Sequence, residues 1–403
     1  MENGSGNSDG PPGVSSTAAA EFLRASRAVL RGEFEREEDR LKVLEAAYEI
    51  AGKVETPWDT YVRLLLNNPA VPACLKVLKD LKLFARWDEL GNEPMTSAEL
   101  AGLVEQCDPA LLHRLLRVLA ANSLVEQVPV DKFKMGPFCS AQATSFGVLL
   151  DYYSHNTQKV LGEMPHILAE MGYRNPVDGA DTVFQRARGY EGDLWSYLRE
   201  HPERSDNFNM LQEVSTGREA PWLDLYPHEA LVASSDPGLP LLVDVGGGIG
   251  HDLMRFHDAY PGSAARMYLA DLPGVVAANI VPDAVNKVGY DFFTPQPIKH
   301  AKAYYLHHVI HDWSDEPARK ILEMQKSAMK PGYSRLLIHD QILDDHKSQL
   351  NTSAFDIVMM VFLAGRERTE KQWLALVESA GLRVVRFWKK PPDSFSVIEL
   401  ELP

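Results

Sequence analysis

The sequence predicts an α/β fold in which a doubly wound sheet of seven strands follows a helical region. Two observations carry this prediction. The chain has 403 residues, more than the roughly 100 to 200 residues of one typical domain. After Pro240, short apolar segments alternate with amphipathic helical segments, which is the signature of such a sheet. We therefore expect a helical domain over residues 21–226 and a sheet domain over residues 227–403.

The chain begins with a segment that has too few apolar side chains to fold. Residues 4–13 consist of Gly, Ser, Asn, Asp and Pro, so we expect residues 1–20 to be a disordered tail. From Phe22 to Glu55, charged residues of both signs mix with apolar ones at helical spacing. This pattern predicts an amphipathic helix with a solvated outer face.

Local signals over residues 96–135 predict a winged helix. Thr96 and Glu99 form a capping-box pattern at the start of one helix. Asp108, followed by proline, marks the start of a second, leucine-rich helix. Residues 123–135 carry β-branched side chains around a turn and predict a small hairpin.

This winged helix is open to two interpretations. It could bind DNA, with Arg114 and Arg117 reaching into a groove, or it could serve as a helical dimerisation platform. The formal net charge of −15 repels nucleic acid and the anionic leaflet of a membrane. We therefore expect no nucleic acid or membrane partner, and favour a homodimer.

Residues 147–226 are predicted to be helical and are rich in aromatic side chains and methionine. We expect most of these side chains in a core, and a minority along a cavity for an aromatic substrate. The sheet domain then alternates strands and helices. Strands are expected near 241–245, 266–270, 285–289, 302–307, 334–339, 383–388 and 395–401. Helices are expected near 251–259, 273–279, 315–328, 353–363 and 370–379.

The cysteine content and the hydropathy pattern suggest where the protein works. Cys74, Cys107 and Cys139 form no CxxC pair, so we expect buried free thiols and neither a disulfide framework nor a zinc site. No apolar stretch approaches the roughly 20 residues that span a bilayer, and no signal peptide is apparent. We expect a cytoplasmic protein.

The run LLVDVGGGIG ends a predicted strand and opens a helix, where backbone must approach a nucleotide-like ligand closely. Its glycines include Gly246, Gly248 and Gly250. A dinucleotide fingerprint would need a further glycine where His251 stands, and Asp244 precedes the first glycine by two residues. These features favour S-adenosylmethionine over NAD as the ligand. Taken alone, the loop could also be a tight turn that binds no ligand.

Two further acids follow predicted strands. Asp271, with Leu272 beside it, ends the next strand 21 residues after Gly250, close to the roughly 20 expected for a carboxylate that grips ribose hydroxyls. Asp291 follows the third strand and could accept from an adenine amino group, with Phe292 as an apolar wall. Asp291 could equally be an ordinary strand end.

The densest motif is YYLHHVIHDWSDE, which begins at Tyr304 and ends at Glu316. Together with LVDVGGGIG, ADLPGVV and GRERTEKQW, it resembles the plant and fungal O-methyltransferases of secondary metabolism, the group that contains caffeic acid methyltransferase. The resemblance covers roughly Pro57 to Leu402. It implies a Rossmann-like domain that binds S-adenosylmethionine, without a metal, behind a winged-helix dimerisation domain.

The resemblance also assigns the chemistry. It implies that His311 is the general base, that Asp340 and Glu367 support it, and that Trp313 packs against adenine. A phenol has a pKa of about 10 and histidine one of about 6.5, so an unassisted imidazole is a weak base for a phenol. Neighbouring carboxylates raise its proton affinity and fix its tautomer.

The sequence departs from the family pattern at two positions. The plant enzymes have glutamate where Asp340 stands, so the shorter side chain is expected farther from His311. His307 stands where a lysine or arginine is usual; its imidazole could still donate to the cofactor carboxylate. Side chains that correspond by similarity to substrate-lining positions, but that could also be helix core, are Met359, Met360 and Phe362.

We therefore predict methyl transfer from S-adenosylmethionine to a hydroxyl, expected to be phenolic, of a small secondary metabolite such as an aromatic or a polyketide. Some fungal proteins of this fold catalyse pericyclic rearrangements, and N- or C-methylation is not separable by motif, so both stay open. A non-catalytic winged-helix regulator is the alternative outside enzymology.

Overall fold

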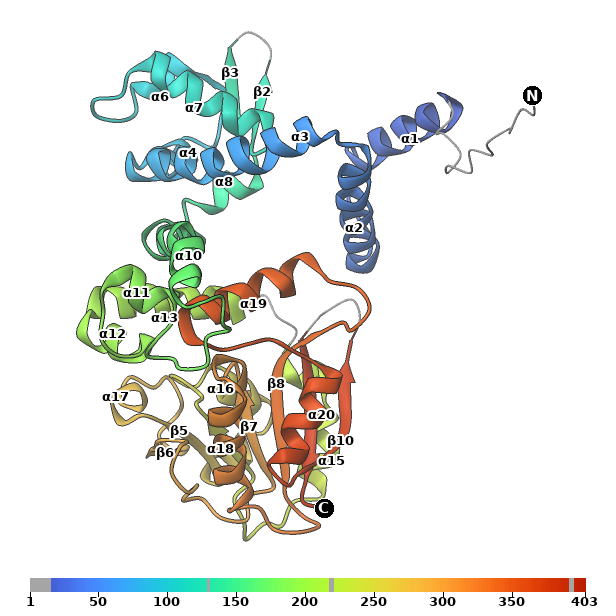
Figure 1. Cartoon of the computed structure of the whole chain (residues 1–403), viewed down its shortest axis with the longest axis vertical. Helices are drawn as coiled ribbons and strands as arrows, with labels where there is room; N and C mark the ends of the chain where they lie inside the picture. The colour runs from blue at the N-terminus through green and yellow to red at the C-terminus, as the bar shows by residue number, and fades with distance from the viewer. Residues whose placement is uncertain (1–15, 129–130, 217–220, 391–394) are drawn as a thin grey trace, which may run out of the picture. The chain divides into compact units, whose positions relative to one another are not determined.

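The computed structural model describes residues 16–128, 131–216, 221–390 and 395–403 (Figure 1). The chain divides into two compact units, Met1–Arg63 and Leu64–Pro403. The winged-helix region and the sheet thus share the second unit, and the boundary at residue 226 stays a prediction. Within the described ranges, no helix has the length and apolar character that crossing a membrane requires.

The first unit contains three helices. They are α1 (Ser16–Val29), α2 (Glu37–Val54) and α3 (Pro57–Tyr61). The single helix expected over 22–55 is wrong, because the chain breaks between α1 and α2 around Gly32, a poor helix former. The expected tail is helical from Ser16 onward, and its residues 1–15 lie outside the described part. None of the three helices contains a buried residue.

The second unit begins with the winged helix. Its elements are η1 (Val62–Asn67), α4 (Asn68–Asp80), α5 (Leu83–Glu89), β1 (Met95–Thr96), α6 (Ser97–Ala101), α7 (Pro109–Ala121), β2 (Val125–Val128) and β3 (Lys132–Met135). Both predicted caps are confirmed: the Thr96 hydroxyl accepts from the backbone N–H of Glu99 at 3.2 Å, and Asp108 accepts from that of Ala110 at 2.7 Å. β2 and β3 pair antiparallel as predicted.

A layer of helices follows the winged helix. It comprises α8 (Pro137–Ala141), η2 (Ser145–Gly147), α9 (Val148–Tyr152), η3 (Tyr153–Thr157), α10 (Gln158–Glu170), α11 (Val183–Arg188), α12 (Leu194–Glu200), α13 (Pro202–Thr216), α14 (Trp222–Leu225) and α15 (His228–Ala233). Its aromatic side chains are largely core, as expected: Phe184 is buried in a cluster with Val160 and Phe362, and Trp222 is buried against the sheet. Cys74 and Cys139 are buried free thiols, whereas Cys107 is half-buried.

The sheet domain has the predicted doubly wound order. Its strands are β4 (Leu242–Val245), β5 (Met267–Asp271), β6 (Asn286–Gly289), β7 (Ala303–His307), β8 (Arg335–Leu343), β10 (Arg383–Lys389) and β11 (Phe395–Glu401). They are ordered β10-β11-β8-β7-β4-β5-β6, and the short β9 (Arg368–Thr369) pairs with β8. In this sheet, β11 pairs antiparallel with β8 and with β10. The pairing of β10 with β11 confirms the predicted terminal hairpin.

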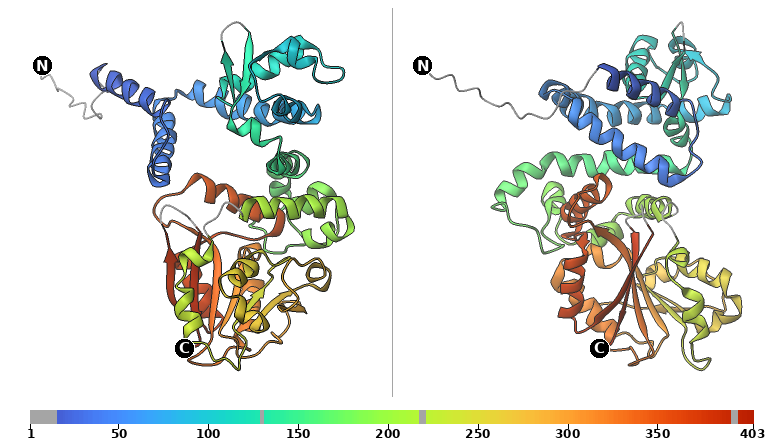
Figure 2. Two further views of the ribbon diagram at one scale, coloured as in Figure 1. Left: turned by 180° about the vertical axis from the view of Figure 1, so that it is seen from behind. Right: turned by 90° about the vertical axis from the view of Figure 1, so that its right-hand side faces the viewer.

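Helices lie on both faces of this sheet (Figure 2). The helical elements between the strands are α16 (His251–Ala259), η4 (Pro261–Arg266), α17 (Pro273–Val276), η5 (Ile310–Asp312), α18 (Asp315–Lys326), α19 (Leu350–Leu363) and α20 (Glu370–Ser379). Of these, α18 and α20 cover one face of the sheet and α16 the other, whereas α19 packs with the helical layer. Alternate side chains of each strand enter different cores. On β7, Tyr304 packs with α18 and α20, whereas Tyr305 packs with α14 and α16.

Candidate active site

The candidate site lies where the strand order reverses. β4 pairs in parallel with β5 on one side and with β7 on the other. Ligands of doubly wound sheets bind outside the carboxyl ends of the strands at such a switch point. The loop after β4 carries the glycine run, and the loop after β7 carries the histidine-rich motif. The topology therefore brings the two strongest sequence motifs to one edge of the sheet.

The glycine loop depends on backbone that other residues rarely adopt. Gly246, Gly248 and Gly250 have φ angles of +69°, +59° and +102°, in the left-handed region that favours glycine. A Cβ on Gly246 would lie 2.8 Å from Cγ2 of Val309, and one on Gly247 would overlap the carboxyl group of Asp244. The loop thus exposes main chain where a ligand can approach it.

Asp244 lies beneath this loop with unused hydrogen-bonding capacity. It is 1% exposed, and its Oδ2 has no hydrogen-bond partner within the described residues. Burial and the neighbouring charge of Asp252 raise the pKa of Asp244 well above its usual value. A buried carboxylate oxygen without a partner costs free energy, so a donor from a ligand would stabilise it.

The acid after β5 braces the same loop. Asp271 Oδ2 accepts from the backbone N–H of Gly248 at 2.8 Å, and its Oδ1 accepts from the N–H of Leu272 at 2.6 Å. Burial raises the pKa of Asp271, although these two N–H groups act in the opposite direction. Asp271 and the glycine loop, which the sequence assigns to the same ligand, therefore lie in contact with each other.

The third predicted acid stands beside an aromatic group. Asp291 is exposed, and its Oδ1 accepts from the backbone N–H of Phe293 at 2.9 Å. Trp313 lies edge-on to Phe292 and Phe293, with ring centroids 6.0 and 4.7 Å away. Asp291, Phe292 and Trp313, which the sequence assigned to adenine, thus gather in one place, together with Phe293.

His307 has a partner that sequence reasoning missed. Its Nδ1 lies 2.6 Å from Oδ2 of Asp252, the second residue of α16, and its ring stacks on His339 with centroids 4.1 Å apart. Burial opposes the charged form of Asp252, but His307 outweighs burial and lowers the pKa of this carboxyl. Asp252 therefore gives His307 an acidic partner within hydrogen-bond distance.

His311 is held by carboxylates on two sides. Its Nδ1 lies 2.9 Å from Oε1 of Glu367, and its Nε2 lies 3.4 Å from Oδ1 of Asp312. Because a carboxylate only accepts, Nδ1 carries a proton and donates it to Glu367. Neither oxygen of the buried Asp340 has a hydrogen-bond partner within the described residues. One ligand atom from each of Asp340, His308 and His311 nevertheless lies within 4.8 Å of the other two.

These carboxylates change the proton affinity of His311. Burial disfavours its charged form, but Glu367, Asp312 and Asp340 outweigh burial and raise its pKa to about 10. Burial also raises the pKa of Asp312 to about 7 and that of Asp340 to about 6. His311 and these three carboxylates form one buried set, in which His311 is a much stronger base than free imidazole.

The loop that presents His311 is anchored by Arg368, another residue that the sequence did not reveal. The Arg368 guanidinium is buried and donates to the carbonyls of Ile310 and Trp313 at 3.2 and 2.8 Å. The backbone N–H of Arg366 donates to the His311 carbonyl at 2.8 Å. Arg368 falls in the GRERTEKQW motif, so that motif supplies both the partner of His311 and the support of its loop.

The predicted substrate-lining residues lie on α19. Met359 and Met360 are partly buried against the helical core, and Phe362 is 2% exposed within it. The ring of Phe362 packs on Phe184, with centroids 5.3 Å apart. Phe362 is therefore core in this structure, whereas the two methionines keep some exposed surface.

Comparison with known proteins identifies the family. An O-methyltransferase domain model matches residues 173–383, and an O-methyltransferase dimerisation domain model matches residues 63–145. The O-methyltransferase mfmE of Annulohypoxylon moriforme is 48% identical over 92% of both chains. The chain belongs to the S-adenosylmethionine-dependent O-methyltransferases. The fold class, the family and the enzyme class predicted from the sequence are confirmed.

Other members of this O-methyltransferase family show a range of named activities. The demethylsterigmatocystin 6-O-methyltransferase of Aspergillus flavus is 32% identical, over 82% of this chain and 84% of its own. A solved structure described as a pericyclic reaction enzyme is 29% identical, with a TM-score of 0.84 over 96% of this chain and 99% of its own. The same values hold for the structure of LepI in complex with S-adenosylmethionine.

Proposed function

We propose that this chain binds S-adenosylmethionine at the switch point and transfers its methyl group to a hydroxyl of a small secondary metabolite, expected to be phenolic. The residues present fit the cofactor. Asp244 offers a buried oxygen without a hydrogen-bond partner in the described part of the chain, and the glycine loop exposes main chain. The other proposed contacts are Asp271, Leu272, Asp291, Phe292, His307 and Trp313. When bound, the sulfonium supplies an electrophilic methyl group.

The observation that carries the proposal is the environment of His311. Its Nε2 is the nitrogen not bonded to Glu367 and is the atom that would accept the proton of the acceptor hydroxyl. Glu367 fixes the tautomer through Nδ1–H and stabilises the imidazolium that results. Because Asp312 and Asp340 add negative charge, the proton affinity of His311 approaches that of a phenolate, with a pKa of about 10.

The experiment that tests this proposal compares His311→Ala with the wild type. Turnover should fall by about a hundredfold to ten-thousandfold, the usual contribution of general acid–base catalysis. Binding of S-adenosylmethionine, measured by isothermal titration calorimetry, should be unchanged because His311 is not a proposed cofactor contact. The acceptor would first be found by incubating labelled cofactor with phenolic polyketides, flavonoids and phenylpropanoids. Wild-type turnover in the variant would contradict the role of His311 as the base.

A second candidate is a pericyclic rearrangement on the same scaffold. The similarity to the solved pericyclic reaction enzyme over nearly the whole chain favours it. A rearrangement leaves the mass of the substrate unchanged and forms no S-adenosylhomocysteine, so mass spectrometry separates the two reactions. The His311 and Glu367 pair favours methyl transfer, since a pericyclic step needs no base for a phenol.

We also propose that the protein is a homodimer formed through the winged-helix region. The match to the dimerisation domain supports this assembly, and sedimentation as a monomer at micromolar concentration would contradict it. We propose no metal requirement, and a chelator should leave turnover unchanged.

A further inference from the structure

We propose that His308, His311 and Asp340 bind a divalent transition-metal ion such as Zn²⁺, and that the bound ion inhibits the enzyme reversibly. The ion would be an inhibitor and not a cofactor, so methyl transfer itself still requires no metal. Binding of the ion does not depend on the function proposed above. Its effect on turnover rests on that function, because it requires that His311 act as the base.

The three side chains come together from two neighbouring strands of the sheet. His308 and His311 follow β7, and Asp340 lies in β8, which pairs in parallel with β7. One ligand atom of each side chain lies within 4.8 Å of those of the other two. In the part of the chain that the structure describes, no other group of three histidine, cysteine or acidic side chains is so arranged. The ligands of a tetrahedral Zn²⁺ ion lie about 3.4 Å apart, so modest side-chain rotations would close the site.

Asp340 gives independent evidence that this place suits a cation. Its side chain is 0% exposed, and among the described residues neither of its oxygens has a hydrogen-bond partner. A buried carboxylate without a donor costs free energy. An ion held by the two histidines would lie beside these oxygens and remove that cost.

The kinds of ligand select a transition metal. Two imidazole nitrogens and one carboxylate oxygen are a set that binds Zn²⁺ and leaves a further position open. Nδ1 of His311 donates to Glu367 at 2.9 Å, which leaves the lone pair of Nε2 for an ion. Histidines that bind metals almost always donate their other N–H to a carboxylate, a carbonyl or water. Glu367 thus orients His311 as a metal ligand is oriented.

The charge around His311 also favours a dication. Asp312, Asp340 and Glu367 are all buried, and Oδ1 of Asp312 lies 3.4 Å from Nε2 of His311, where it could become a fourth ligand. The nearby Arg368 guanidinium already has an acid of its own, Asp315, at 2.8 Å. The buried carboxylates around His311 are therefore in excess, and a dication would balance them.

The ion and the acceptor hydroxyl need the same electron pair. In the proposed transfer, the lone pair on Nε2 of His311 accepts the hydroxyl proton. A metal ion on Nε2 uses that lone pair for a coordination bond, so the base is blocked while the ion is bound. Loss of the ion returns the lone pair unchanged, and the inhibition is therefore reversible.

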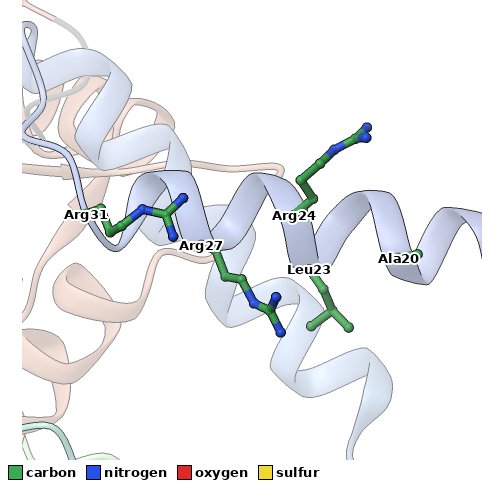
Figure 3. Close-up of a pocket in the computed structure, with 5 residues that line it drawn as sticks. All are labelled: Ala20, Leu23, Arg24, Arg27 and Arg31. Carbon is green, nitrogen blue, oxygen red and sulfur yellow. The ribbon is translucent and has the colours of Figure 1, made fainter.

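The groove along α1 does not compete for the ion. It is lined by Ala20, Leu23, Arg24, Arg27 and Arg31 (Figure 3). Arginine stays positively charged and has no lone pair to offer, so this groove repels Zn²⁺. A surface pair such as His166 and Glu170, at 3.2 Å, supplies two ligands where Zn²⁺ takes four. We therefore expect one tightly bound ion per chain.

The first test follows Co²⁺ binding to the full chain by visible absorption, which reports the ligands of this ion. The wild type should bind one Co²⁺ tightly, and Zn²⁺ should displace it, because Zn²⁺ binds the same ligands more tightly. His308→Asn should raise the dissociation constant at least about tenfold, since it removes a ligand. Asparagine suits the position, because His308 has a φ of +53°, which asparagine adopts more readily than most residues.

A matched control and a second ligand variant make this test independent of one substitution. His300→Asn changes another histidine with a left-handed backbone, at a φ of +59°, before the opposite end of β7. It should bind Co²⁺ as the wild type does. Asp340→Asn should weaken binding at least about tenfold, like His308→Asn. Wild-type affinity for Co²⁺ in either ligand variant would overturn the site.

The second test measures turnover with added metal. Zn²⁺ should inhibit the wild type, and a chelator, which has no effect on the metal-free enzyme, should restore the full rate. Mg²⁺ at the same concentration should not inhibit, because it prefers oxygen ligands. In His308→Asn, the Zn²⁺ concentration that halves the variant's own metal-free rate should rise at least about tenfold. Equal sensitivity to Zn²⁺ in the wild type and His308→Asn would overturn inhibition at this site.

The two tests separate failure of this proposal from failure of the proposed function. The Co²⁺ titration needs no acceptor, so it tests the site even in a chain that transfers no methyl group. Full turnover of the wild type with the site saturated would overturn the inhibition and contradict the role of His311 as the base, whereas the metal site itself would stand.

Discussion

Two parts of the candidate site, here called the catalytic end and the cofactor end, use the same pair of groups, a histidine beside a carboxylate, for different purposes. At the catalytic end, His311 contacts Glu367 at 2.9 Å, and Asp312 and Asp340 add further negative charge. At the cofactor end, His307 contacts Asp252 at 2.6 Å beside the glycine loop. His311 has excess negative charge around it, whereas the acid beside His307 also meets the cation Arg255 at 3.1 Å. We propose that the surplus of carboxylates makes His311 a base, and that the balanced pair of His307 and Asp252 forms a fixed binding surface.

The largest effect should follow from removing the carboxylate that contacts His311. Glu367→Gln keeps the shape but lowers proton affinity and removes the charge that stabilises imidazolium, so kcat should fall by about a hundredfold. Cofactor affinity should not change, because the cofactor end is untouched. Steady-state kinetics and calorimetry on the same preparation check both statements. A loss of cofactor affinity with an unchanged kcat would contradict the separation of the catalytic end from the cofactor end.

The next effect concerns the backbone at the cofactor end. Gly246→Ala places a side chain at a φ of +69° and 2.8 Å from Val309, which costs about 2 to 4 kcal/mol in strain and overlap. We expect the affinity for S-adenosylmethionine to fall at least tenfold. Gly262→Ala is the matched control, because a Cβ there meets nothing within 4 Å. Equal affinities in the two variants would mean that the loop does not bind the cofactor.

A smaller effect is expected at the balanced pair. Asp252→Asn keeps a hydrogen-bond acceptor for His307 but removes the negative charge, so His307 loses its charge partner. The affinity for S-adenosylmethionine should fall about fivefold, with kcat at saturating cofactor unchanged. If kcat falls and affinity does not, His307 belongs to the catalytic end.

The smallest effect should come from Asp340, which acts on His311 through charge without a hydrogen bond. Asp340→Asn should lower kcat by about threefold and leave cofactor affinity unchanged. A loss as large as that of Glu367→Gln, measured in the same assay, would show that Asp340 contacts the reacting groups directly.

Much of the fold was predictable because the central strands of the sheet are buried. β4, β7 and β8 read as largely apolar runs between turn signals, and all seven strands lie within a few residues of their predicted positions. The glycine loop and Asp271 were predictable because their roles depend on local backbone and on spacing along the chain. The helix N-caps at Thr96 and Asp108 were predictable for the same reason.

The rest depended on contacts between distant residues. Asp252 follows an ordinary histidine at a helix start, and only the pairing of β4 with β7 brings it to His307. Arg368 is 55 residues from Trp313, and no local pattern indicates that it anchors the His311 loop. The segment from Phe22 to Glu55 was misread as one solvated helix, because its apolar positions border charged ones and predict amphipathicity without indicating a break.

The most direct test of the central claim is the pH dependence of kcat/KM in the wild type and in Glu367→Gln. Carboxylates raise the pKa of His311 to about 10, so wild-type activity should rise with pH until it levels off near pH 10, where the imidazole loses its proton. Removing the charge of Glu367 lowers this pKa, and the rising limb should therefore move to lower pH while the maximal rate falls. A limb at the same pH in both proteins would contradict a base set by its carboxylate partners.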